Sequence, residues 1–191
     1  MGKDYVVVVS GLPRSGTSMM MKMLEAGGQE ILTDNLREAD ANNPKGYYEF
    51  ERVKDLKDGD LAWLPEAKGK VVKIVTGLIT FLPAGYNYKV IFMQRDLTEI
   101  LASQKKMLGR LGKGDDNIPD GQMAKIYQEH LKQVKSWLFK QPHMDVLYVN
   151  YNTMVADPLD SLHKVNALLG GDMDLSAMAA VVDRELYRER K

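Results

Sequence analysis

The chain of 191 residues contains no cysteine and only three histidines. The absence of cysteine excludes disulfide bridges, thiolate zinc sites and a cysteine nucleophile. Net charge is absent as well, because 26 basic residues balance 26 acidic ones. This balance gives no overall attraction to nucleic acid or to an anionic membrane. Any affinity for anions must therefore be local.

A secretory signal and a membrane anchor are not expected either. The N-terminus leads within a few residues into the apolar run at 6–9, which leaves no room for them, so we expect a cytoplasmic protein. The length, with 45% hydrophobic and 27% charged residues, predicts a single domain over residues 1–191.

Short apolar runs alternate with helical patterns along the chain. The runs predict strands at 6–9, 71–76, 89–94 and 145–150. Helical patterns follow from about residue 16, from 97, from 120 (capped by Asp120), from the Asp-Pro pair at 157–158 and from 176. This alternation predicts an α/β fold with three layers, in which helices flank a parallel sheet and ligands bind at the carboxyl ends of the strands.

The segment at residues 11–18, GLPRSGTS, connects the first strand to an apolar helix. Two glycines let successive N–H groups point at one anion, and the helix adds its positive end. The spacing fits a phosphate-binding P-loop, except that Thr17 stands where nucleotide hydrolases have lysine and the cation is Arg14. We therefore expect a P-loop NTPase-like fold whose anion site takes its cation from within the loop.

This segment resembles the 5′-phosphosulfate loop of sulfotransferases that use 3′-phosphoadenosine-5′-phosphosulfate (PAPS), in which Lys or Arg stands at the place of Arg14. The resemblance implies that Arg14, Ser15, Gly16, Thr17 and Ser18 bind the phosphosulfate. Because arginine does not donate a proton near neutral pH, Arg14 is expected to assist transfer electrostatically.

Arg95 follows the strand at 89–94, and Ser103 comes eight residues later in the next helix. This pair resembles the residues with which the same family binds the 3′-phosphate of PAPS, and charge-assisted bonds from arginine suit a phosphate dianion. From the residues alone, the alternative is a surface pair of Arg95 with Asp96 or Glu99 and a solvent-facing Ser103.

The segment at 145–170 resembles a third part of the family, a strand followed by Tyr-Glu-Asp, Asp-Pro and a helix that ends in Leu-Gly. The resemblance implies that Tyr151 lies near the adenine, and plain core packing is the alternative. Asn152 and Thr153 stand where the family has two acidic residues.

A proton acceptor is harder to assign. Many cytosolic relatives have a histidine in a Lys-Thr-His phrase after the second strand, but residues 73–77 contain none. The segment at 43–49, NPKGYYE, resembles a phrase of bacterial sulfotransferases, which implies Glu49 as the base; a structural salt bridge is the alternative. Lys73 is a further candidate to contact the transferred group. The family's C-terminal segment that covers the 3′-phosphate is absent, and Arg188 is the candidate substitute.

Together these segments predict a sulfotransferase that moves a sulfuryl group from PAPS to a hydroxyl or amine acceptor and releases adenosine 3′,5′-bisphosphate (PAP). We expect a small-molecule or other acceptor that enters beside Glu49 and the loop at 109–121, with no nucleic acid, membrane or metal involved. Neither strand 89–94 nor strand 145–150 ends in a carboxylate that would hold Mg²⁺, and Asp96 comes nearest. The alternatives are a Mg²⁺-dependent P-loop kinase for a nucleotide or small molecule, and a non-catalytic nucleotide-binding protein.

Overall fold

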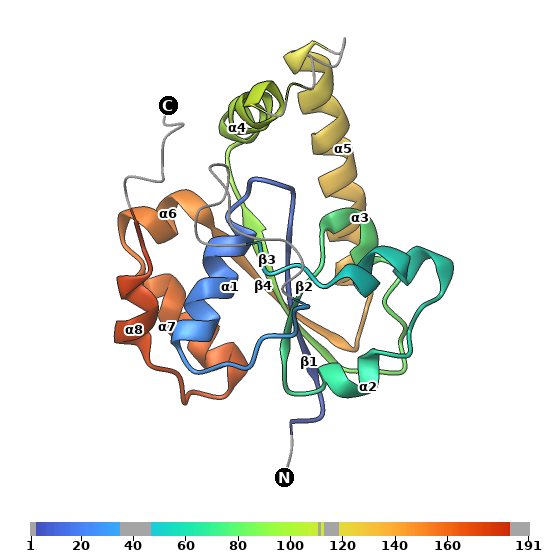
Figure 1. Cartoon of the computed structure of the whole chain (residues 1–191), viewed down its shortest axis with the longest axis vertical. Coiled ribbons are helices and arrows are strands. Elements are labelled where there is room, and N and C mark those ends of the chain that lie inside the picture. Colours follow the sequence, from blue (N-terminus) through green and yellow to red (C-terminus); the bar gives the residue numbers. More distant parts are fainter. Residues whose placement is uncertain (1–2, 35–46, 111, 113–118, 184–191) are drawn as a thin grey trace.

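The structure is a computed structural model that describes residues 3–34, 47–110, 112 and 119–183. Its centre is a four-stranded parallel sheet with the order β2-β1-β3-β4 (Figure 1). The strands are β1 (Val6–Gly11), β2 (Val71–Lys73), β3 (Tyr88–Gln94) and β4 (Met144–Asn150). Because all four run in the same direction, their carboxyl ends lie at one edge of the sheet.

Helices cover both faces of the sheet, as Figure 1 shows. They are α1 (Thr17–Ala26), η1 (Glu51–Asp58), α2 (Leu64–Ala67), α3 (Thr76–Ile79), α4 (Leu97–Arg110), α5 (Asp120–Phe139), α6 (Tyr151–Ala156), α7 (Leu159–Leu169) and α8 (Leu175–Ala180). The predicted three-layer α/β fold is therefore confirmed.

Alternate residues of β1 belong to two separate hydrophobic clusters. Val6 and Val8 pack with residues of η1, α2, α3 and α5 on one face. Val7 and Val9 pack with residues of α1, α6, α7 and α8 on the other. All four side chains are fully buried, which explains why this strand is a continuous apolar run and does not alternate with polar residues.

The structure differs from the expected elements in a few places. The second strand ends at Lys73, and α3 begins at Thr76, which was expected to close the strand. Asp120, which was expected to cap its helix, is instead the first residue of α5, and Pro119 is the N-cap. The short helix α6 was not predicted. It follows β4 directly, and the Asn150 side chain caps it by accepting from the Thr153 N–H.

The helix α5 is buried only near its C-terminal end. Val134 and Leu138 are buried, whereas Ile126 is 48% exposed. Figure 1 shows the reason, because the N-terminal half of α5 extends beyond the sheet beside α4. No helix in the described ranges is both long and apolar enough to span a membrane.

Candidate active site

The loop that follows β1 depends on two glycines that approach other groups closely. A Cβ atom on Gly11 would lie 2.4 Å from Ser15 Oγ and 2.8 Å from the carbonyl oxygen of Met93. A Cβ atom on Gly16, whose φ is +95°, would lie 2.3 Å from Cδ2 of Tyr151. The loop can therefore curl this tightly against β3 and α6 only with glycine at both positions.

The N-terminus of α1 has the properties of an anion site. Gly16 is its N-cap, no side chain caps it, and its first turn contains no acidic residue. The Ser15 N–H donates to the Leu12 carbonyl at 3.1 Å. The Ser15 hydroxyl, in contrast, is buried with no hydrogen-bond partner among the described residues. A phosphate or sulfate oxygen would satisfy both this hydroxyl and the helix end.

Arg14 holds an unusual backbone conformation in the same loop. Arg14 (φ 72°) and Tyr48 (φ 52°) are the non-glycine residues of the described ranges with left-handed φ. Such strain is concentrated at functional sites, and both residues belong to segments that the sequence predicts to be functional. The Arg14 Nε donates to Ser103 Oγ at 3.0 Å. The structure thus joins a residue predicted at the phosphosulfate to one predicted at the 3′-phosphate.

Arg95 connects the glycine loop to α4 and α6. Its Nη1 donates to the Arg14 carbonyl at 3.1 Å, and its Nε donates to Glu99 Oε2 at 2.9 Å. The guanidinium carbon lies 4.5 Å from the centre of the Tyr151 ring. The Arg95–Glu99 pair that the sequence offered as a surface alternative does form, but the two side chains are only 7% and 4% exposed. Ser103 is likewise buried and does not face solvent.

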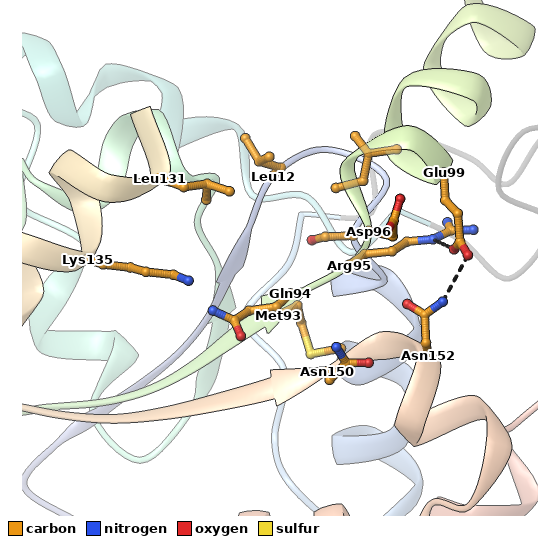
Figure 2. Close-up of a pocket in the computed structure, with 12 residues that line it drawn as sticks. Leu12, Met93, Gln94, Arg95, Asp96, Glu99, Leu131, Lys135, Asn150 and Asn152 are labelled. Atoms are coloured by element: carbon orange, nitrogen blue, oxygen red, sulfur yellow. Dashed lines mark hydrogen bonds and ion pairs between the residues drawn. The ribbon is translucent and has the colours of Figure 1, made fainter. Parts of the chain in front are cut away.

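A cavity of about 550 Å³ opens at the carboxyl ends of β3 and β4, between α4 and α5. Ser15 and Arg95 line it, whereas the other predicted site residues that the structure describes do not. In Figure 2 the Lys135 amine points toward Gln94 from α5. The cavity therefore adjoins the loop and is bordered by α4, α5 and α6.

Glu49 lies near the end of β2. Lys73 Nζ is 3.9 Å from Glu49 Oε1, and it donates a hydrogen bond to the Tyr47 carbonyl. The Tyr48 hydroxyl donates to Glu25 Oε2 of α1 at 2.6 Å, and burial together with this carboxylate raises the pKa of Tyr48. The segment 47–49 is thus held by both β2 and α1. Glu49 forms the ion pair that the sequence offered as an alternative, and its role as a base stays a prediction.

The sequence did not indicate two further contacts. The first is a 3.0 Å hydrogen bond from Asn152 of α6 to Glu99 of α4. The spacing of Arg95 and Glu99 predicts an ion pair between those two residues, but it does not predict that the pair is buried. His130 of α5 lies with Nε2 2.9 Å from Thr76 Oγ1. This contact places an imidazole beside the segment 73–77, which itself contains no histidine. His130 and Thr76 are 54 positions apart, so no local sequence pattern indicates the contact.

Some predictions concern residues outside the described ranges. They include Arg188, most of the loop at 109–121 and the first part of the NPKGYYE segment. Within the described ranges, no group of three histidine, aspartate or glutamate residues is placed to hold a metal ion.

Comparison with known proteins gives the family. The family model described as "Sulfotransferase domain" matches residues 4–189. The chain belongs to the sulfotransferase domain family. A search of curated proteins finds no match to it.

Solved structures similar to this sulfotransferase domain share its fold at low sequence identity. Mouse sulfotransferase SULT7A1 complexed with PAP is 20% identical, with 96% of this chain and 64% of that chain covered and a TM-score of 0.58. Retinol dehydratase in complex with androsterone and inactive cofactor PAP is 15% identical, with 96% and 64% covered and a TM-score of 0.56. A sulfotransferase from Alicyclobacillus acidocaldarius is 13% identical, with 97% of both chains covered and a TM-score of 0.53. The domain thus spans 64% of the length of the first two proteins.

Proposed function

We propose that this sulfotransferase domain transfers a sulfuryl group from PAPS to a hydroxyl or amine of a small-molecule acceptor. One observation carries the proposal, namely that Arg14 and Arg95 meet at the glycine loop through the bond from Arg95 Nη1 to the Arg14 carbonyl. PAPS carries a phosphosulfate and a separate 3′-phosphate, so its enzyme needs two cationic sites that are close together. A Mg²⁺-dependent P-loop kinase instead needs a carboxylate to hold its metal, and β3 and β4 end in Gln94 and Asn150.

The groups of the loop fit the phosphosulfate. The buried Ser15 hydroxyl and the uncapped end of α1, which begins with Thr17 and Ser18, are suited to its oxygens. Gly16 provides the close approach of the backbone, and Arg14 provides the charge. Arg95 and Ser103 are proposed to bind the 3′-phosphate, and the hydrogen bond between Ser103 and Arg14 supports adjacent sites for the two anions.

Tyr151 is proposed to border the adenine site. Its ring is buried against Gly16 and lies under the Arg95 guanidinium. Tyr151 thus packs in the core, as the alternative to an adenine contact predicted. The same contacts hold its side chain between the two proposed anion sites. The edge of the ring is therefore suited to contact the nucleoside that links the anions.

The chemistry is an in-line displacement at sulfur. PAPS supplies the sulfuryl group, whose sulfur bonds to the acceptor atom as its bond to the 5′-phosphate oxygen breaks and PAP leaves with the electron pair. Arg14 stabilises the negative charge that develops on the bridging and equatorial oxygens. We propose that the Glu49 carboxylate takes the proton of the acceptor, and the buried Lys73 orients it from 3.9 Å.

The similar structures support PAPS as the donor and a small molecule as the acceptor. The mouse sulfotransferase is complexed with PAP, and retinol dehydratase is complexed with androsterone and PAP. At identities of 20% and 15%, these likenesses show the fold alone, and the class of acceptor is part of the proposal.

Release of PAP from PAPS tests the proposal, with pooled phenol, alcohol and amine acceptors. Replacement of Arg14 by alanine is expected to lower turnover by at least about 100-fold, because it removes a donor aimed at the developing charge. Arg14→Lys retains the charge and the Cβ atom and is expected to retain part of the activity. Turnover of Arg14→Ala at the wild-type rate would exclude the proposed role of Arg14, and no PAP release by the wild type with any pool would favour a non-catalytic protein.

A further inference from the structure

The Glu99 carboxylate is buried at the centre of a polar cluster beside the loop. Its two oxygens accept separate hydrogen bonds, Oε2 from Arg95 Nε at 2.9 Å and Oε1 from Asn152 Nδ2 at 3.0 Å. Figure 2 shows these two bonds, which connect the end of β3 to α4 and α6. With a side chain that is 4% exposed, Glu99 has lost most of its contact with water, so these bonds must compensate for the cost of its burial.

The cluster restrains Arg95 on several sides. Glu99 holds Nε, the Arg14 carbonyl accepts from Nη1, and the Tyr151 ring lies against the face of the guanidinium. Tyr151 is itself pressed against Gly16. These contacts hold the Arg95 guanidinium in one orientation beside the loop.

We infer that Glu99 is a positioning residue that fixes the Arg95 guanidinium for the 3′-phosphate of the donor, with Asn152 holding Glu99 in turn. A free arginine side chain has many rotamers, and the cost of ordering it on binding reduces affinity unless the protein has ordered it beforehand. The inference rests on the proposed function, since it requires that Arg95 binds this phosphate. It also gives a physical reason for Asn152 at a position where the family has an acid, because an amide can donate to Glu99 and a carboxylate cannot.

The negative charge of Glu99 and its positioning of Arg95 have opposite effects on the affinity for the 3′-phosphate. If net charge alone controlled binding, removal of the carboxylate would leave Arg95 uncompensated and would tighten the binding of anions. If orientation controls binding, the same change weakens the contact with the 3′-phosphate. The sign of the effect therefore distinguishes the two roles.

The test compares PAP with adenosine 5′-monophosphate (AMP), which lacks only the 3′-phosphate, by calorimetric titration. The dissociation constant of AMP divided by that of PAP measures how much the 3′-phosphate contributes to affinity. We expect this ratio to be about ten or more for the wild type. Glu99→Ala is expected to lower this ratio about tenfold, which is the lower end of the loss seen when the outer partner of a metal ligand is removed, and to leave AMP affinity unchanged. Glu129→Ala removes an exposed carboxylate on α5 as a control for charge, and its ratio should equal that of the wild type.

The double variant Glu99→Gln with Asn152→Asp tests rescue. It keeps the net charge of the pair and reverses the polarity of the bond between them. The new amide on α4 can accept from Arg95 through its oxygen and donate to the new carboxylate on α6, so the wild-type ratio should return. If Glu99→Ala fails to fold, Asn152→Ala replaces it, because this change keeps the Arg95–Glu99 pair and should lower the ratio in the same direction by a smaller factor.

The possible results separate the inference from the proposed function. A wild-type ratio near one would show that the 3′-phosphate has no site, and the proposed function would fail with the inference. A high wild-type ratio that Glu99→Ala preserves or increases would overturn the positioning role alone. Equal weakening of PAP and AMP would assign Glu99 a merely structural role and would overturn the inference too.

Discussion

The close approach of Gly16 to Tyr151 leads to a prediction with an internal control. In Gly16→Ala the new Cβ atom would lie 2.3 Å from Cδ2 and 3.0 Å from Cε2 of Tyr151, at a φ of +95°. Gly28 has nearly the same φ, +92°, but nothing lies within 4 Å of its Cβ position. Gly28→Ala therefore has the backbone strain of Gly16→Ala without the clash.

The magnitudes follow from these two contributions. A left-handed conformation costs an L-residue about 1–2 kcal/mol, which is the whole loss expected for Gly28→Ala. Overpacking against a ring that cannot move away costs about 1–3 kcal/mol more. The Tyr151 ring is confined because it is buried under the Arg95 guanidinium. Gly16→Ala should thus lower the free energy of unfolding by about 2–5 kcal/mol.

Denaturant unfolding of both variants, alone and combined with Tyr151→Ala, measures the difference. Once the ring is gone, Gly16→Ala should cost no more than Gly28→Ala, and the coupling between Gly16 and Tyr151 should be about 1–3 kcal/mol. Equal losses for the two glycines in the wild-type background would refute the packing of Tyr151 on the loop. A coupling near zero would refute it as well.

Two further predictions concern the acceptor side of the site. Glu49→Gln should lower kcat about 100- to 10,000-fold without changing PAP affinity. As a control, Glu51→Gln changes an exposed neighbour and should leave both kcat and PAP affinity unchanged. A wild-type kcat in Glu49→Gln would exclude Glu49 as the base. Burial, and then the hydrogen bond to Glu25, raises the pKa of Tyr48 above its ordinary 10.0, so the native state keeps a proton that the unfolded chain releases. Its contribution to stability is complete below pH 10.0 and is lost as pH rises further, and Tyr48→Phe should show a shallower alkaline loss in denaturant titrations; an unchanged slope would contradict this.

The parts of the fold that the sequence predicts are those with a local pattern. The apolar run at 6–9, the glycine loop and the strand at 89–94 each carry their signal within a few residues, and the structure confirms them. The second strand is shorter than its apolar run, because after Lys73 the chain leaves the sheet and Thr76 begins α3. Apolar residues at the end of a strand do not reveal where pairing stops.

The contacts of the site are less predictable, because they join distant segments. Arg14 and Ser103 are 89 positions apart, and nothing near either residue indicates that they meet. The Arg95–Glu99 spacing predicts an ion pair, but its burial depends on Tyr151 and Asn152, which both come from the distant helix α6. The roles of Arg14, Ser15, Gly16, Thr17, Ser18, Glu49, Arg95, Ser103 and Tyr151 remain predictions that the variants above address.

Calorimetric titration of the wild type and Arg95→Ala with PAP, beside ATP with Mg²⁺, tests the central claim most directly, because it needs no knowledge of the acceptor. We predict that PAP binds the wild type more tightly than Mg²⁺-ATP does. Arg95→Ala should lose most of this affinity, because Arg95 is the proposed partner of the 3′-phosphate. Preference for Mg²⁺-ATP, or no binding of PAP, would contradict the claim that this domain uses PAPS.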